Sequence, residues 1–213
     1  VARVAGTSGQ QYPVTEQEIR SLISVGKEAG AVEASEAEML EKVFHFGDRH
    51  VAEIMTPRPE IVSIEKQTTL RHFLAVYAEH YHTRFPVFED SEDNIIGVIS
   101  VKDIMKAQGQ EELQLDSEVT HLLRPAHFVP ETKTVGSLFT ELRERGQSIS
   151  MLVDEYGGIA GLVTLKQLIS VIVGPVGEEG QPLESPYASV GNNTFLLDAD
   201  LSVDQTNERL GLH

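Results

Sequence analysis

The sequence has no cysteine, few basic residues and no long apolar run. Without cysteine the chain can form no disulfide, no thiolate metal site and no cysteine nucleophile. Lys and Arg number 17 against 33 Asp and Glu, which gives a net charge of −16. This balance argues against non-specific binding to nucleic acid and against docking on an anionic membrane by charge alone. No apolar stretch approaches the roughly 20 residues that span a bilayer, so we expect the chain as given to be soluble.

Motifs of common enzyme and metal classes are missing as well. The sequence contains no His-Glu-x-x-His zinc motif, no Gly-x-Ser-x-Gly elbow, no Walker loop and no dinucleotide fingerprint. His80 and His82 are too close together, in a predicted loop, to form a helical metal-binding face. No nucleophile and base stand out as a pair. We therefore expect neither an enzymatic activity nor a metal site.

The chain instead contains an internal repeat, whose copies lie about 65 residues apart, a period typical of a whole supersecondary unit used twice. Residues 69–77, 86–89 and 96–104 of the first copy correspond to residues 134–142, 151–154 and 160–168 of the second. Two such units packed together create a pseudo-symmetric cleft, and clefts are the usual ligand sites.

The apolar pattern predicts an α+β fold in which both copies place their strands and helices in the same order. The first copy is expected to have strands at 61–64, 85–88 and 95–99, helices at 70–81 and 100–105, and a hairpin loop at 90–94. The second is expected to have strands at 150–153 and 159–163, a helix at 135–145 that ends at Gly146, and a helix from Thr164.

Shorter patterns flank the repeats. Capping-box spacings, Thr15 with Glu18 and Ser35 with Glu38, predict two helices before the first copy. After the second copy, residues 194–197 predict a strand and residues 204–210 predict a helix. One strand and one helix cannot bury a core by themselves. This tail is therefore either docked on the rest or the beginning of a further domain.

Two strand-to-helix corners, Ser100 to Asp103 and Thr164 to Gln167, have two interpretations. A hydroxyl followed three residues later by an acid or amide is a capping box, worth about 1 kcal/mol of helix stability. The same corner also presents backbone N–H groups to a ligand, and a carboxylate one turn into the helix can accept both hydroxyls of a ribose. Asp103 is suited to that role, whereas Gln167 accepts only through its carbonyl and carries no charge.

Two arginines are candidates for phosphate binding near these corners. Arg84 precedes Phe85 and Pro86, and its guanidinium is a candidate phosphate fork or, alternatively, an exposed group paired with an acid. Phe85 and Pro86 either face a flat ring or belong to the core. Arg124 is a second cation near the start of the second copy, and the stretch that matches Arg84 in that copy has no arginine.

These residues resemble a known family. The two units are similar to a tandem pair of CBS domains, the β-α-β-β-α module named for cystathionine β-synthase. The wider layout resembles the cytosolic part of CorC/HlyC-type proteins, a transporter-associated family for magnesium and cobalt efflux that is related to the cyclin M proteins. The match covers about residues 15–180 and is carried by the stretches 46–49, 54–58, 128–131, 153–158 and 161–164.

The resemblance implies a pseudo-two-fold CBS pair with N-terminal linker helices and a partial C-terminal domain. The implied division is a flexible segment at 1–14, an N-terminal helical linker at 15–55, CBS domain 1 at 56–106, a connector at 107–120, CBS domain 2 at 121–174, and a linker with the truncated start of a CorC/HlyC-type domain at 175–213.

The resemblance also implies a function. Members bind an adenine nucleotide, AMP or ATP with or without Mg²⁺, and form homodimers through their CBS domains. It further implies a membrane domain of the same protein before Val1, which places the module on the cytoplasmic face of the cell membrane. The expected role is non-enzymatic regulation of magnesium and cobalt transport, with no nucleic acid involved. The alternative is a structural dimerisation module whose clefts bind no nucleotide.

Site residues follow from the same resemblance. The residues expected to bind nucleotide are Thr56, Arg84, Phe85, Pro86, Ser100, Asp103, Arg124, Thr164, Lys166 and Gln167. The family usually has Thr-x-Glu-Asp at the second corner, where this chain has Lys166 and Gln167 in place of the two acids. A charged hydrogen bond is worth about 1.5–3 kcal/mol, so its loss should weaken the second site more than tenfold. Lys166 partly offsets this by approaching phosphate.

Overall fold

The structure is a computed structural model that describes residues 14–177, 187–191, 194–197, 206–207 and 210. The chain divides into two units, Val1–Gly174 and Pro175–His213. Within the described residues, no helix is both long and apolar enough to cross a bilayer. The predicted flexible segment at 1–14 lies almost wholly outside the described residues, as does most of the predicted helix at 204–210.

Two helices precede the repeats, α1 (Glu16–Glu28) and α2 (Ala34–Phe46). The predicted capping box at Thr15 is confirmed, because Glu18 N donates to Thr15 Oγ1 at 3.3 Å and Thr15 N donates to Glu18 Oε2 at 2.8 Å. The predicted box at Ser35 is wrong. The N-cap is Glu33, whose N–H donates to Glu36 Oε2 at 3.1 Å, so Ser35 already lies in the first turn of α2.

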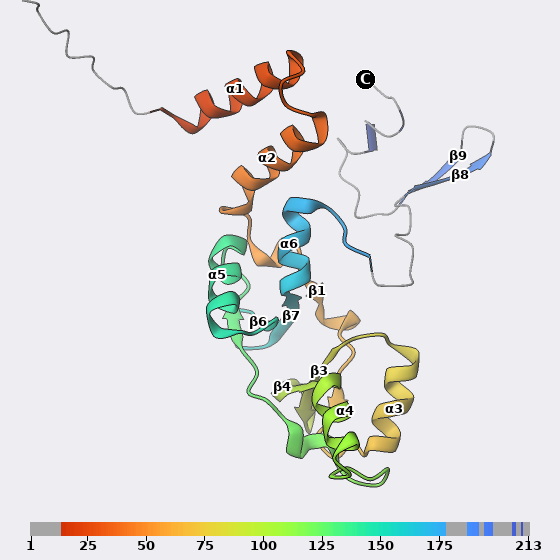
Figure 1. Cartoon of the computed structure of the whole chain (residues 1–213). Coiled ribbons are helices and arrows are strands. Elements are labelled where there is room, and N and C mark those ends of the chain that lie inside the picture. The colour runs from red at the N-terminus through yellow and green to blue at the C-terminus, as the bar shows by residue number, and fades with distance from the viewer. Residues whose placement is uncertain (1–13, 178–186, 192–193, 198–205, 208–209, 211–213) are drawn as a thin grey trace, which may run out of the picture. The chain divides into compact units, whose positions relative to one another are not determined.

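The first repeat forms a three-stranded sheet with the order β2-β3-β4. Its helices are α3 and α4, which lie beside β3 and β4 (Figure 1). Strand β2 runs parallel to β3, and β3 runs antiparallel to β4. Its elements are β2 (Ile64–Glu65), α3 (Leu70–Glu79), β3 (Arg84–Glu89), β4 (Ser91–Ser100) and α4 (Val101–Gly109), and strand β1 (Thr56–Pro57) precedes them.

Three predictions for the first repeat need correction. The strand expected at 61–64 is confined to Ile64–Glu65, because only these residues pair with β3. The loop expected at 90–94 belongs mostly to β4, since the chain turns at Asp90, whose φ of 65° is left-handed. The helix expected at 100–105 runs from Val101 to Gly109 instead.

The second repeat forms β5 (Phe128–Pro130), α5 (Val135–Arg145), β6 (Ile149–Val153), β7 (Ile159–Thr164) and α6 (Leu165–Val173). Its sheet has the order β1-β7-β6-β5. The predicted helix at 135–145 is confirmed, and it ends at Gly146, whose φ of 62° suits a residue without a side chain.

The two repeats exchange their leading segments. Strand β1 precedes the first repeat in the chain, yet it pairs antiparallel with β7, with Thr56 opposite Leu162. In return, Arg124, which leads into the second repeat, forms a bridge with Val98 of β4. Each sheet is thus extended by backbone from the other half of the pair, and this exchange positions the two predicted corners.

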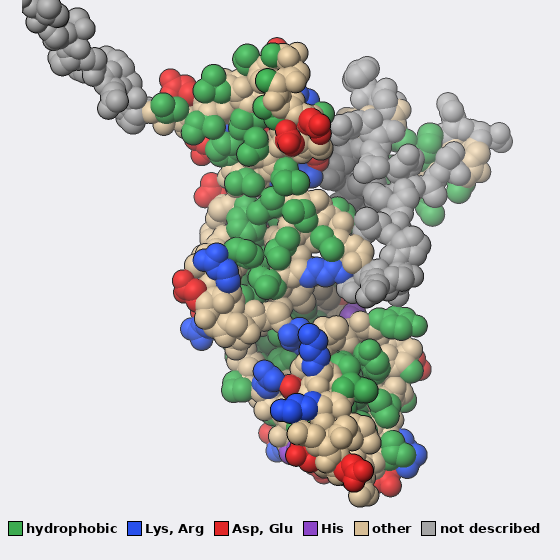
Figure 2. All heavy atoms as spheres, in the orientation of Figure 1, with side chains coloured by type: hydrophobic (Ala, Val, Ile, Leu, Met, Phe, Trp, Pro, Cys, Tyr) green, Lys and Arg blue, Asp and Glu red, His purple; other side chains and the backbone are tan. Residues whose placement is uncertain are grey.

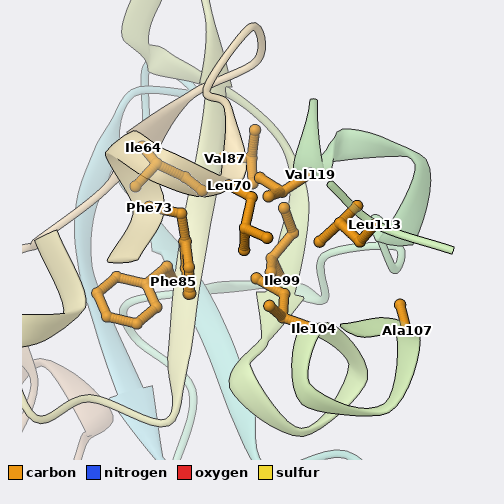
Figure 3. Packing of buried hydrophobic residues seen from close by; sticks show 10 residues of the cluster. All are labelled: Ile64, Leu70, Phe73, Phe85, Val87, Ile99, Ile104, Ala107, Leu113 and Val119. Carbon is orange, nitrogen blue, oxygen red and sulfur yellow. The ribbon is translucent and has the colours of Figure 1, made fainter. Parts of the chain in front are cut away.

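Three apolar clusters hold these sheets. The first lies within the first repeat, where Phe73 from α3 packs against Phe85 from β3 with ring centroids 5.3 Å apart (Figure 3). The second lies within the second repeat and includes Val51 from the segment after α2. The third joins the repeats and contains Ile95, Val98, Ile149, Met151, Ile159 and Leu162.

In the second unit, the structure describes a strand pair, β8 (Tyr187–Gly191) and β9 (Thr194–Leu197). The strands pair antiparallel, with Tyr187 opposite Leu197 and Ala188 opposite Leu196. The predicted strand at 194–197 is therefore confirmed.

Candidate functional site

The two predicted corners are pseudo-equivalent. Arg124 forms an antiparallel bridge with Val98 of β4, and Thr56 pairs in the same way with Leu162 of β7. A proline follows both Arg124 and Thr56 in the sequence. A glycine precedes each strand position and makes room for the added backbone. A Cβ on Gly97 would lie 2.6 Å from the carbonyl oxygen of Arg124. A Cβ on Gly161 would lie 2.6 Å from the carbonyl oxygen of Thr56.

At the first corner, Asp103 contacts Arg124 instead of capping its own helix. Asp103 Oδ2 accepts from Arg124 Nε, and Asp103 Oδ1 accepts from Arg124 Nη2, both at 2.6 Å. Ser100 occupies the N-cap of α4, but its side chain makes no capping hydrogen bond. The capping-box interpretation is therefore wrong here. A bidentate, charge-assisted pair is stronger than a neutral cap, so the carboxylate takes the distant partner.

At the second corner, the capping box is confirmed. Gln167 N donates to Thr164 Oγ1 at 3.2 Å, and Thr164 N donates to Gln167 Oε1 at 2.8 Å. Gln167 also reaches across to the exchanged segment, where Nε2 donates to Thr56 Oγ1 at 2.9 Å. Gln167 with Thr56 is thus the uncharged counterpart of Asp103 with Arg124.

Positive charge gathers around the first corner. The hydrogen bonds from Arg124 hold the pKa of Asp103 below its ordinary value, and the charges of Arg124, Lys106 and Arg84 act in the same direction. Figure 2 shows Lys and Arg side chains gathered on this face of the first repeat, near β4 and α4. In a chain with a net charge of −16, such a group is a local exception. It suits an anionic ligand at the N-terminus of α4.

A pocket of about 260 Å³ lies beside this corner. The Asp103–Arg124 pair forms part of its wall, and Lys106 and His121 add two more potentially cationic groups. Arg124 is well exposed, with 67% of its side-chain surface accessible, whereas Asp103 is mostly covered at 21%. The guanidinium therefore has room to move, while the carboxylate stays in place.

Strand β3 places the remaining candidates of the first corner. Arg84 is half-buried and pairs with Ser100 across the β3–β4 ladder. Phe85 is fully buried in the first apolar cluster (Figure 3), so it is a core residue in this structure. Since neighbouring strand residues face opposite sides of a sheet, Pro86 lies on the other face, which it shares with its ladder partner Val98, and it is also buried.

A model of the CBS domain matches residues 51–109 and 117–174, which together make up more than half of the chain. The chain belongs to the CBS-domain family. Curated relatives include UPF0053 protein YhdP of Bacillus subtilis, 34% identical over 200 residues, covering 93% of this chain and 45% of the relative. UPF0053 protein sll0260 of Synechocystis is 35% identical over 210 residues, covering 98% of this chain and 46% of the relative. The chain thus spans less than half the length of these relatives.

Solved structures extend the comparison of this CBS pair. The CBS domain of a bacterial CNNM/CorC family Mg²⁺ transporter is 40% identical with a TM-score of 0.72, covering 78% of this chain and 99% of that one. A complex of such a domain with ATP is 42% identical with a TM-score of 0.62, covering 66% and 99%. A CBS-domain pair from Klebsiella pneumoniae with bound AMP is 26% identical with a TM-score of 0.52, covering 59% and 99%. The predicted resemblance to CorC/HlyC-type CBS pairs is confirmed.

The second CBS repeat contains a polar array that the sequence did not reveal. His127 Nδ1 lies 2.7 Å from Ser150 Oγ, and His127 Nε2 lies 3.0 Å from Glu141 Oε1. Glu141 also pairs with Lys133 and with Arg145, and the hydrogen bonds from Lys133 and then His127 lower the pKa of Glu141 to about 2. No motif signals this array, because its members come from separate elements.

The order Ser150, His127, Glu141 is that of a hydrolytic triad, but its setting is structural. Ser150 is only 1% exposed, so a substrate cannot reach its hydroxyl. The array instead fastens β6 and α5 to the segment before β5. Among the described residues, no cluster of three potential metal ligands is found.

Proposed function

We propose that this CBS pair is a non-enzymatic regulatory module that binds an adenine nucleotide, AMP or ATP, between its repeats. The observation that carries the proposal is the first corner, where Asp103 lies among Arg84, Lys106 and Arg124. A carboxylate suits the two ribose hydroxyls, and guanidinium and ammonium groups suit phosphates. The related structures with ATP and with AMP support the same ligand class.

The first corner would be the stronger of two sites. There Ser100 and Asp103 would hold the ribose, while Arg84 and Arg124 would hold phosphate and Pro86 would face the base. The second corner would use Thr56, Thr164, Lys166 and Gln167. It lacks a carboxylate, so its affinity should be more than tenfold lower.

The nucleotide would act on a larger protein. The chain spans less than half the length of its curated relatives, and we propose that a membrane domain for magnesium or cobalt transport accompanies it. In that arrangement the CBS pair would dimerise on the cytoplasmic face, and α1 and α2 would connect it to the membrane. A nucleotide changes transport only if it binds two arrangements of the dimer with different affinity.

Calorimetric titration with AMP, ADP and ATP, each with and without Mg²⁺, tests the proposal. Nucleotide at 100 times Kd should raise the free energy of unfolding by about 2.7 kcal/mol. Asp103→Ala and Arg84→Ala should each weaken binding about tenfold or more with little loss of fold. Arg71→Ala is the matched control. Arg71 lies on α3 and pairs with Asp116 of the connector, away from the corner.

Three outcomes would contradict the proposal or its site. If no nucleotide binds or stabilises the protein, the structural dimerisation module becomes the better interpretation. If phosphate is released from ATP in the presence of Mg²⁺, the expectation of a non-enzymatic module fails. Unchanged affinity in both corner variants would show that the ligand binds elsewhere.

A further inference from the structure

The Asp103–Arg124 pair joins residues that belong to different CBS repeats. Arg124 is fixed by two backbone hydrogen bonds to β4, one from Val98 N to Arg124 O at 2.9 Å and one from Arg124 N to Val98 O at 3.0 Å. Asp103 lies one turn into α4. The side chains alone therefore decide whether this contact is closed or open, since both backbones are held by secondary structure.

In the closed pair, Asp103 and Arg124 use the same hydrogen-bonding groups that a nucleotide would need. A vicinal diol and a guanidinium both bind a carboxylate side-on through its two oxygens, and Arg124 already contacts both oxygens of Asp103. A phosphate likewise accepts two N–H hydrogen bonds from a guanidinium, and the two N–H groups of Arg124 that would serve now donate to Asp103. Ribose and Arg124 thus compete for Asp103, while phosphate and Asp103 compete for Arg124.

We infer that the Asp103–Arg124 pair is a latch, which a nucleotide opens by exchanging both partners at once. Ribose takes Asp103 and phosphate takes Arg124, so the carboxylate keeps two hydrogen-bond donors and the guanidinium keeps an anionic partner. This inference rests on the proposed nucleotide site and states how that site is regulated. The latch favours ligands that carry a vicinal diol and a phosphate on one molecule over nucleosides, which supply only the diol.

Exposure of the arginine makes the exchange feasible. Arg124 is 67% exposed, so water partly screens the pair and can hydrogen-bond the guanidinium as it leaves Asp103, which lowers the cost of opening. A nucleoside that opened the latch would leave Arg124 unpaired beside Lys106 and Arg84, which adds a repulsive cost. At the second corner the corresponding contact, Gln167 with Thr56, is uncharged, so opening it leaves no charge behind.

Titration of the wild type and two variants with adenosine, AMP and ATP tests the latch. Arg124→Gln removes the competitor for Asp103, so its affinity for adenosine should rise about two- to fivefold. Its affinity for ATP should fall about tenfold or more, because a phosphate contact is lost. Adenosine carries no charge, so a change in the electrostatic potential of the site would not by itself raise the affinity for adenosine.

The matched control is Arg84→Gln, which removes a cation of the same corner that has no hydrogen bond to Asp103 among those in the structure. Its affinity for ATP should fall while its affinity for adenosine stays unchanged. Thermal unfolding of both variants verifies that the fold is retained. A second measurement uses tripolyphosphate, which has no ribose. Glu112 lines the same pocket as Asp103, but the two hydrogen bonds from the Arg124 guanidinium both go to Asp103. Asp103→Asn should therefore raise the affinity for tripolyphosphate more than Glu112→Gln does, because only the former releases Arg124.

The outcomes separate the latch from the nucleotide site. If the wild type binds ATP but Arg124→Gln binds adenosine no more tightly than the wild type, the latch is wrong and the site stands. If Asp103→Asn and Glu112→Gln raise tripolyphosphate affinity equally, the latch is also wrong. If the wild type binds no nucleotide at all, the proposed function and the latch fail together.

Discussion

Gly97 and Gly161 make the exchange of leading segments possible, so a methyl group at either position should loosen the pair of repeats. The added Cβ would lie 2.6 Å from a backbone carbonyl oxygen in each case, well inside the contact distance of about 3.5–4.0 Å. At Gly97 the displaced carbonyl is that of Arg124, which accepts from Val98 N at 2.9 Å. Relief of the clash therefore disturbs a backbone hydrogen bond as well as packing.

Overpacking in a well-filled region costs about 1–3 kcal/mol, and each disturbed hydrogen bond costs about 0.5–1.5 kcal/mol. We therefore expect Gly97→Ala and Gly161→Ala each to lower the free energy of unfolding by about 2 kcal/mol. Urea unfolding followed by circular dichroism, with linear extrapolation to water, measures this loss.

Gly109→Ala is the matched control. Gly109 is the last residue of α4, and a Cβ there would meet no atom within 4 Å. Alanine is the better helix former by up to about 1 kcal/mol, so this variant should be as stable as the wild type or more stable. Gly97→Ala should also weaken nucleotide binding at the first corner, since it moves Arg124, whereas Gly161→Ala should spare that corner.

The reasoning is refuted if both alanine variants stay within about 0.5 kcal/mol of the wild type, the range of ordinary surface substitutions. That result would mean that the repeats tolerate separation of β1 from β7 and of Arg124 from β4. It would also remove the structural basis for treating the two corners as shared between repeats.

Three further outcomes are expected. Because Lys133 holds the pKa of Glu141 at about 2, Glu141 stabilises the fold above its unfolded pKa of about 4.5. Glu141→Gln should therefore be most destabilising near pH 7, and its deficit in urea unfolding should shrink as pH falls through 4 toward 2. Thr164→Ala should cost about 1 kcal/mol of stability in the same assay, whereas Ser100→Ala should cost less, because only Thr164 caps its helix. Phe85→Ala should lower the free energy of unfolding by about 3–5 kcal/mol, as expected for a core aromatic; a smaller loss would place its ring outside the core.

The repeat, the fold class and most helices could be predicted because their signals are local or periodic. Thr15 with Glu18 and Thr164 with Gln167 form capping boxes whose partners lie three residues apart. The α5 helix ends where a left-handed glycine is needed, at Gly146. In each case the interaction that decides the structure lies within one turn of the chain, so the sequence pattern contains it.

The first corner could not be predicted in the same way. Ser100 and Asp103 have the same spacing as a capping box, but Asp103 binds Arg124, which lies 21 residues away. Only the exchanged segment brings that arginine close, and nothing in the local pattern reports the exchange. The array of Ser150, His127 and Glu141 escaped prediction for the same reason, since its members are 23 and 14 residues apart.

The swapped leading segments have a consequence for how such a protein can be divided. A polypeptide with only the first half would lack Arg124, whose backbone pairs with Val98 of β4. A polypeptide with only the second half would lack β1, which pairs with β7. Two identical copies of one half could supply each other with what is missing. The present chain thus has the architecture that two identical halves would form if they exchanged their leading segments and were joined by a tether.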